Sequence, residues 1–105
     1  FRSTGGEYQS SYYCCSILLK PSIAPKRFEL VSYLKQRGIG TSVYYPRPVP
    51  HFTYYRDRYG YDDRSFPVAK MISDTTIALP VGPHLNGDDM RYIVESLKEG
   101  IASLK

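Results

Sequence analysis

The sequence predicts an α+β fold, a two-layer sandwich in which helices cover one face of a small, mainly antiparallel sheet of three or four strands. Three short β-type runs alternate with segments of helical periodicity. Prolines end the runs, and no internal repeat divides the 105 residues. A chain of this length forms one domain, so we expect a flexible lead-in over residues 1–11 and a single domain over residues 12–105.

Three segments have the composition of strands. Tyr12–Leu19 (YYCCSILL) is a nearly continuous apolar and aromatic run, which predicts a central strand that ends before Pro21. Gly40–Tyr45 and Thr76–Leu79 are the second and third predicted strands, and Pro80 ends the last of them.

Two helices are predicted between these strands. The first covers residues 25–37, because it begins with proline, has apolar residues at helical spacing and is followed by Gly38. Between the second and third strands, residues 53–64 have no clear period and predict an ordered excursion with a helical turn. A short helix then covers residues 67–74, with Ser65 as its predicted N-cap.

The C-terminal helix has the clearest signal. Asn86 is its predicted N-cap, and Asp88 and Asp89 lie in the first turn, where the helix dipole favours negative charge. Gly100 interrupts the helix at a cost of about 1 kcal/mol relative to alanine. Apolar residues at helical spacing form the predicted buried stripe: Met90, Ile93, Val94, Leu97, Ile101 and Leu104.

The composition excludes several classes of protein. No run of eighteen apolar residues is present that could span a membrane, and the first ten residues lack the apolar core of a signal peptide. Cys14 and Cys15 are adjacent on a predicted strand and point to opposite faces, so we expect reduced thiols and a cytoplasmic location. Two cysteines and two distant histidines make no zinc site. A net charge of +4 suits a phosphate-bearing ligand but falls short of a DNA-binding protein.

The most informative stretch is GIGTSVYYPRPVPHF, residues 38–52. A strand there leads directly into a loop stiffened by three prolines, which carries Tyr44, Tyr45, Arg47 and His51. Rigid loops at strand ends are where binding sites usually lie, so these four side chains are the candidate site.

Tyrosine and arginine continue beyond this loop. Arginine binds phosphate bidentately and tyrosine offers a stacking face, which suits a nucleotide, a phosphorylated ligand or single-stranded nucleic acid. The same composition is typical of an amphipathic cover or a domain interface, which is an equally good interpretation. The segment contains Tyr44, Tyr45, Arg47, His51, Tyr54, Tyr55, Arg56, Arg58, Tyr59, Tyr61 and Arg64.

Other reactive side chains are better explained by structure than by catalysis. Lys70 follows a serine but lies in a short helix without a glycine-rich phosphate loop, so Schiff-base chemistry there is not predicted. His51 and His84 have no serine or cysteine at a useful spacing for nucleophilic catalysis. The pair Asp62-Asp63 is typical of a solvated turn.

Two stretches of the chain together resemble a known family. GIGTSVYYPRPVPHF resembles the segment after the first helix in the small C-terminal domain of DegT/DnrJ/StrS-type nucleotide-sugar aminotransferases, and residues 66–97 resemble the ending of that domain. Tyr44 stands where histidine is frequent, and one residue is inserted before His51. The matching residues are Gly38, Ile39, Tyr44, Tyr45, Pro46, Pro48, Val49 and His51, then Phe66, Pro67, Ala69, Leu79, Pro80, Asp88 and Asp89.

The resemblance implies an aminotransferase small domain. Those enzymes are dimeric, fold-type I transaminases that depend on pyridoxal phosphate, and their cofactor lysine, ring-nitrogen aspartate and phosphate-binding residues lie mostly in a large N-terminal domain. It therefore implies no cofactor-binding, metal-binding or catalytic residue in this chain, which alone is predicted inactive. It implies that Tyr44, Tyr45, Arg47 and His51 contact a nucleotide-sugar substrate. The implied partners are the large domain of the same enzyme and a second subunit, with no nucleic acid or membrane.

Two alternatives remain at this point. The first is a stand-alone binding module that uses the Tyr/Arg-rich segment for a nucleotide, a phosphate-bearing ligand or single-stranded nucleic acid, with binding that weakens steeply with salt. The second is an interaction protein that self-associates through the sheet face left uncovered by helices.

Overall fold

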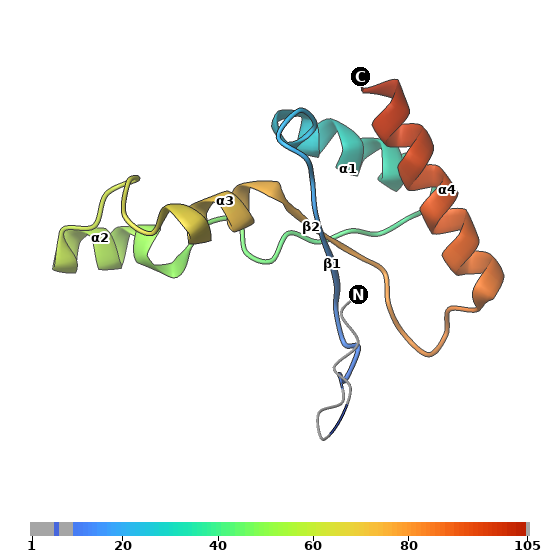
Figure 1. Cartoon of the computed structure of the whole chain (residues 1–105), viewed down its shortest axis with the longest axis horizontal. Helices are drawn as coiled ribbons and strands as arrows, with labels where there is room; N and C mark the ends of the chain where they lie inside the picture. The colour runs from blue at the N-terminus through green and yellow to red at the C-terminus, as the bar shows by residue number, and fades with distance from the viewer. Residues whose placement is uncertain (1–5, 7–9, 105) are drawn as a thin grey trace.

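The computed structural model describes Gly6 and residues 10–104 (Figure 1). In this part of the chain the order is β1, α1, α2, α3, β2 and α4, which is the predicted α+β class. Most of the predicted lead-in at residues 1–11 lies outside the described residues. Cys14 and Cys15 are free, and no helix of the described residues is long and apolar enough to cross a membrane.

The sheet of the described chain has two antiparallel strands. β1 (Cys15–Leu18) pairs with β2 (Thr76–Leu79), and β2 has the predicted bounds. The first strand was predicted from Tyr12 but begins at Cys15. Because β2 stops before Pro80, the residues that precede Cys15 have no strand opposite them.

The predicted strand over residues 40–45 is reduced to one bridge. The Ser42 N–H donates to the Ala78 carbonyl at 3.1 Å, and the Ala78 N–H donates back at 2.7 Å. Alternate residues of a strand face the same neighbour, so the next positions of this chain that could hydrogen-bond to residues 40–45 are Thr76 and Pro80. Pro80 has no N–H, and the Thr76 N–H already closes the last turn of the preceding helix. The prediction of three or four strands was therefore wrong for the described residues, which form a two-stranded sheet.

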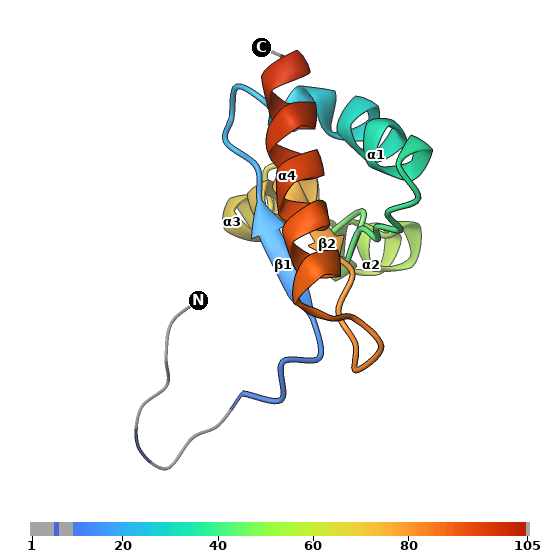
Figure 2. The same ribbon diagram turned by 90° about the vertical axis from the view of Figure 1, so that its right-hand side faces the viewer.

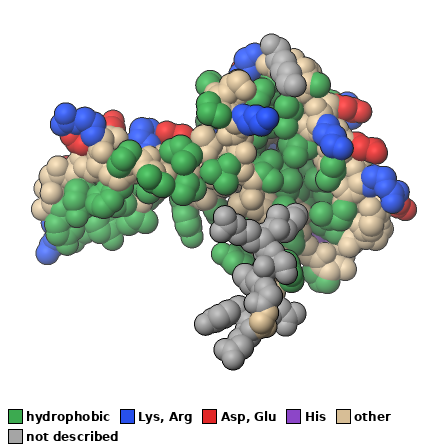
Figure 3. All heavy atoms as spheres, in the orientation of Figure 1, with side chains coloured by type: hydrophobic (Ala, Val, Ile, Leu, Met, Phe, Trp, Pro, Cys, Tyr) green, Lys and Arg blue, Asp and Glu red, His purple; other side chains and the backbone are tan. Residues whose placement is uncertain are grey.

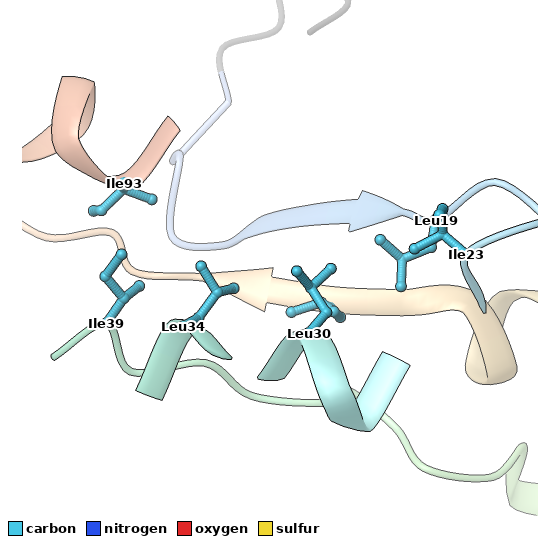
Figure 4. Packing of buried hydrophobic residues seen from close by; sticks show 7 residues of the cluster. Leu19, Ile23, Leu30, Leu34, Ile39 and Ile93 are labelled. Carbon is cyan, nitrogen blue, oxygen red and sulfur yellow. The ribbon is translucent and has the colours of Figure 1, made fainter. Parts of the chain in front are cut away.

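Two helices form the second layer. α1 (Arg27–Gln36) follows a 3-10 turn at Ala24–Lys26, and α4 spans Gly87–Ser103, which confirms both predicted helices. Ile17 and Ile77 are paired across the sheet and pack into the core with these helices. The buried core, shown in Figure 4, consists of Leu19, Ile23, Leu30, Leu34, Ile39, Ile77 and Ile93.

α4 begins with a capping box. The Asn86 Oδ1 accepts hydrogen bonds from the N–H groups of Asp88 and Asp89, and the Asp89 Oδ2 accepts one from the Asn86 N–H. The predicted N-cap is confirmed, and the first turn of α4 has its otherwise unpaired donors satisfied.

The chain between the Ser42 bridge and β2 projects from the body (Figure 1), and in the turned view of Figure 2 it points away from the viewer, behind the body. We call residues 46–75 the arm. It contains a 3-10 turn at Val49–His51, α2 (Thr53–Tyr59) and α3 (Pro67–Thr75). α2 occupies the predicted ordered excursion, and α3 matches the predicted short helix. The radius of gyration is 16.2 Å, against about 13 Å for a compact chain of this length.

Ser65 does not cap α3, contrary to the prediction. The N-cap position belongs to Phe66, which has φ 57° and makes no side-chain cap. The Ser65 hydroxyl instead accepts a hydrogen bond from the Asp62 N–H at 3.1 Å and donates to the Asp62 Oδ1 at 3.3 Å. The hydroxyl is therefore used by the turn that precedes the helix.

Arg27 connects the arm to the body. Its side chain is buried, and its Nη1 donates to the carbonyl of Ser73 at 2.5 Å and to that of Thr76 at 3.4 Å. In the described part of the chain it forms no ion pair. Its charge faces the carbonyls at the C-terminal end of α3, where the helix dipole is negative.

Candidate functional site

The predicted site segment, residues 44–51, leads from the body into the arm. It leaves the sheet at the Ser42 bridge and continues through an extended proline, Pro48, into the 3-10 turn of the arm. Its side chains line two hollows rather than one. The two tyrosines line the first hollow, and Arg47 and His51 line the second.

The first hollow, which we call the tyrosine hollow, has a volume of about 500 Å³. Tyr44 and Tyr45 are 56% and 67% exposed, and their rings lie edge to face with centroids 6.0 Å apart. Ser16 belongs to the sheet face opposite the core, and with Thr41 and Ser42 it adds hydroxyl groups to the lining. Aromatic faces beside hydroxyl groups suit a sugar ring or a nucleobase.

The second hollow, which we call the charged hollow, has a volume of about 350 Å³ and is lined by residues of the arm. Arg56 pairs with Asp63 at 3.1 Å, and Lys70 pairs with Asp74 at 2.7 Å. Arg47 also lines this hollow and takes part in no ion pair with the described residues. The uncompensated positive charge of Arg47 therefore makes this hollow suitable for an anionic group such as a phosphate.

His51 is buried at the edge of the charged hollow, with 4% of its surface exposed. Its Nε2 lies 2.6 Å from the Ser65 carbonyl oxygen. A carbonyl only accepts hydrogen bonds, so Nε2 carries a proton and donates. In the neutral ring the Nδ1 is then the acceptor, and His51 holds the turn before α3 while it lines the hollow.

The turn that His51 contacts is stabilised by Asp62. Arg64 binds the Asp62 carboxylate through Nη2 at 2.7 Å and Nε at 3.0 Å, and its backbone N–H donates at 2.8 Å. These hydrogen bonds, with the side-chain one foremost, lower the pKa of Asp62 from 3.8 to about 2. The same contact raises the pKa of Arg64. The pair was predicted as a solvated turn, and the Asp62 and Asp63 side chains are indeed 46% and 71% exposed. Asp62 holds the turn together, and Asp63 lines the charged hollow.

The two ion pairs of the charged hollow were not predicted from the sequence. Arg56 and Asp63 are separated by the end of α2 and a turn, so no helical spacing links them. Lys70 and Asp74 are four residues apart on α3, which is the spacing of a helical ion pair and was a usable signal. Lys70 was considered only as a catalytic lysine.

The surroundings of Lys70 do not fit the role of a Schiff-base lysine for pyridoxal phosphate. A Schiff-base lysine needs a neutral amine in a shielded site. The ammonium of Lys70 is held by Asp74 on a half-exposed helix surface. Nor do three or more His, Cys, Asp or Glu side chains of the described chain gather where they could hold a metal ion.

Comparison with known proteins identifies related sequences over most of the chain. The family model for the DegT/DnrJ/EryC1/StrS aminotransferase family matches residues 2–98. The pleiotropic regulatory protein of Geobacillus stearothermophilus is 38% identical over 76 residues, which are 72% of this chain and 20% of that protein. The dTDP-3-amino-3,4,6-trideoxy-alpha-D-glucose transaminase of Streptomyces venezuelae is 32% identical over 74 residues, 70% of this chain and 19% of that protein. The chain thus spans about a fifth of the length of these relatives.

Solved structures share the fold. The putative sugar aminotransferase Spr1654 of Streptococcus pneumoniae, in its PMP-form, superposes with a TM-score of 0.77 at 24% identity, over 88% of this chain and 23% of that one. PseC of Helicobacter pylori, an aminotransferase of pseudoaminic acid biosynthesis, superposes with a TM-score of 0.76 at 21% identity, over 86% of this chain and 24% of that one. The fold agrees with the sequence match, and the chain belongs to the DegT/DnrJ/EryC1/StrS aminotransferase family.

Proposed function

We propose that this chain is the small C-terminal domain of a pyridoxal-phosphate-dependent nucleotide-sugar aminotransferase and closes the substrate side of its active site. Family membership and the fold of the solved sugar aminotransferases support this assignment. The observation that carries it is the segment of residues 44–51, which lines an aromatic, hydroxyl-rich hollow at one end and a charged hollow at the other. A nucleotide sugar has the matching parts, since it joins rings to phosphates.

The four predicted residues have separate roles in this proposal. Tyr44 and Tyr45 contact the sugar or the base through their ring faces and hydroxyl groups. Arg47 binds a phosphate oxygen with its free guanidinium group. His51 offers its Nδ1 as an acceptor and keeps the turn at Ser65 in place.

The cofactor belongs to the rest of the enzyme in this proposal. Pyridoxal phosphate supplies an electron sink for amino transfer when it is bound. The large domain of the same enzyme would hold it, and the whole enzyme would work as a cytoplasmic homodimer. This chain would bind and orient the substrate and exclude water from one side of the site.

The test is a titration of the isotope-labelled 105-residue chain with dTDP-glucose, followed by amide NMR. We expect saturable shifts for residues 41–52. Arg47→Ala should weaken binding about tenfold, because it removes a charge-assisted hydrogen bond. Arg91→Ala is the matched control, since Arg91 pairs with Asp88 on the exposed face of α4. Its affinity should equal that of the unchanged chain.

Two results would contradict the proposal. One is the absence of saturable shifts up to about 10 mM ligand, which corresponds to less than about 3 kcal/mol of binding. The other is a set of shifts that lies outside both hollows. A separate test adds pyridoxal phosphate and then borohydride, and we expect no saturable adduct. A tight adduct on Lys70 would show that the chain carries its own cofactor site.

A further inference from the structure

His51 presents to the charged hollow one ring nitrogen that the protein itself does not use. Its Nε2 donates to the Ser65 carbonyl oxygen at 2.6 Å. Its Nδ1 accepts no hydrogen bond from the described residues, yet none of their fully buried side-chain nitrogens and oxygens lacks a partner. Nδ1 is therefore not fully buried, and the small exposed part of the residue includes this atom. A ligand in the hollow can reach it.

The other charged groups of the hollow are mostly paired with one another. Asp63 binds Arg56 at 3.1 Å. Asp74 binds Lys70 at 2.7 Å, and Figure 3 shows acidic and basic side chains close together along the upper edge of the arm. Arg47 takes part in no ion pair with the described residues. The hollow thus offers a ligand two unoccupied groups, the guanidinium donor of Arg47 and the imidazole acceptor.

The Ser65 carbonyl that holds His51 lies outside the hydrogen bonds of α3. The helical ladder begins one residue later, where the Lys70 N–H donates to the Phe66 carbonyl at 3.0 Å. Phe66 has φ 57°, a left-handed value that residues other than glycine rarely adopt. This angle turns the peptide group between Ser65 and Phe66 out of the helix direction, so its carbonyl oxygen accepts from His51 instead.

Asp62 closes the turn that places this carbonyl. Its Oδ1 accepts from the Arg64 N–H at 2.8 Å and from the Ser65 N–H at 3.1 Å. The Ser65 N–H also donates to the Asp62 carbonyl at 3.0 Å, and the Ser65 hydroxyl donates to Oδ1 at 3.3 Å. An aspartate that accepts from backbone groups two and three positions later is typical of such a turn. Since His51 binds the carbonyl of Ser65, the effect of Asp62 on the imidazole passes through Ser65.

We propose that Asp62 is a positioning residue for the substrate site. Through the Ser65 carbonyl it holds His51 with Nε2 as a donor inside the protein and Nδ1 as an acceptor for a hydroxyl group of the ligand, beside the phosphate that Arg47 binds. The hold on His51 stands on the contacts above, whereas the nature of the ligand rests on the proposed function.

An acceptor at this place selects a hydroxyl group rather than a phosphate oxygen. The ionised phosphates of a nucleotide sugar offer only acceptors, and the lone pair of an imidazole nitrogen repels them. A phosphate oxygen would bind Nδ1 only if the ring took up a proton and became a cation. Sugar hydroxyls donate hydrogen bonds, so the neutral ring of His51 and the cation of Arg47 together fit a hydroxyl group next to a phosphate.

The first test is a proton–nitrogen correlation spectrum of the imidazole rings in the isotope-labelled chain without ligand. We expect a cross-peak for the Nε2 proton of His51, because a buried, hydrogen-bonded proton exchanges slowly with water, and His51→Phe identifies it by its loss. Asp62→Ala should remove the cross-peak, because the turn at Ser65 is no longer closed. Asp62→Asn should keep it, since an amide oxygen accepts the same backbone hydrogen bonds.

Asp57→Ala is the matched control for Asp62→Ala. Asp57 is an exposed aspartate on α2 of the same arm and forms no ion pair with the described residues. The cross-peak of His51 should be unchanged in this variant. If Asp62→Ala fails to fold, Ser65→Ala decides, because it removes the hydroxyl bonds to Asp62 and keeps the carbonyl. The Nε2 proton should then exchange about threefold faster.

The second test is the affinity for dTDP-glucose. Asp62→Ala and His51→Phe should each weaken binding about fivefold, which is the effect of one neutral hydrogen bond. The double variant should bind no more weakly than either single variant, because both changes remove the same contact. In the complex with the unchanged chain, the Nδ1 of His51 should remain without a proton.

Each part of the inference has a result that overturns it. A His51 cross-peak that Asp62→Ala leaves unchanged shows that Asp62 does not hold the ring. Unchanged affinity in Asp62→Ala and His51→Phe shows that the ligand does not use Nδ1. Protons on both ring nitrogens in the complex show that His51 binds a phosphate oxygen as a cation. If the unchanged chain binds no dTDP-glucose, the proposed function fails, and the spectrum without ligand still decides the role of Asp62.

Discussion

At the scale of the residue, Arg27 shows how a single buried side chain sets the position of a whole segment. It is the first residue of α1, yet its guanidinium reaches the carbonyls of Ser73 and Thr76 at the junction of α3 and β2. Two helices that are distant in sequence are joined through one side chain. The sequence showed a basic residue in the first turn of a helix, which gave no signal of this contact.

Replacement of Arg27 should therefore destabilise the fold. Arg27→Met keeps the length of the side chain but leaves the carbonyls of Ser73 and Thr76 without their donor. A hydrogen bond from a charged group contributes about 1.5–3 kcal/mol, so we expect a loss of about 2 kcal/mol in the free energy of unfolding. Urea unfolding followed by circular dichroism measures it.

The matched control for Arg27→Met is Arg91→Met. Arg91 forms an exposed ion pair with Asp88, and exposed pairs contribute about 0–1 kcal/mol. Equal stability losses in the two variants would show that the buried contact of Arg27 has no special role.

At the scale of the element, local signals predicted the helices better than the sheet. The capping box at Asn86 and the proline that begins α3 act within one turn, and both were readable. The strand predicted over residues 40–45 failed for reasons that lie elsewhere in the chain. That strand needed backbone N–H donors at positions 76 and 80. Pro80 has no N–H, and the Thr76 N–H is already hydrogen-bonded to α3.

Gly100 of α4 lies against α1, so its role depends on the packing of two helices. Alanine at this position of α4 would gain about 1 kcal/mol of helix propensity. Its Cβ would, however, lie 2.7 Å from Leu30 Cδ1 and 2.8 Å from Tyr33 Cδ1, and Leu30 is fully buried. Overpacking of a core costs about 1–3 kcal/mol, so we expect Gly100→Ala to destabilise the chain by about 1 kcal/mol.

Gly87→Ala provides the matched comparison for Gly100→Ala on the same helix. Nothing lies within 4 Å of a Cβ built on Gly87. This substitution should stabilise the chain by about 0.5 kcal/mol through a lower entropy of the unfolded state. Thermal unfolding of both variants measures the difference, and a stabilised Gly100→Ala variant would show that α1 and α4 are less closely packed than the structure indicates.

At the scale of the whole molecule, the sequence predicted the fold class and the family but not the shape. Periodicity and proline positions indicate which segments are helices and strands, because these signals are local. They do not say that residues 46–75 leave the body as an arm. For the same reason the candidate site was predicted as one cluster, whereas Tyr44 and Tyr45 line one hollow and Arg47 and His51 line another.

The division into body and arm predicts two levels of local stability. α1 and α4 share the buried core that includes Leu30, Leu34 and Ile93, whereas α2 has no buried residue and α3 buries only Ser73. Backbone amides open most easily in an element that has few apolar contacts. The free energy of opening there is about 0–2 kcal/mol, whereas in a core it approaches the full free energy of unfolding.

Hydrogen exchange measured by mass spectrometry tests these two levels. Peptides from α2 should exchange first, those from α3 next and those from α1 and α4 last. Peptides from α2 that exchange as slowly as those from α4 would contradict this division, because they would show that the arm is held as firmly as the core.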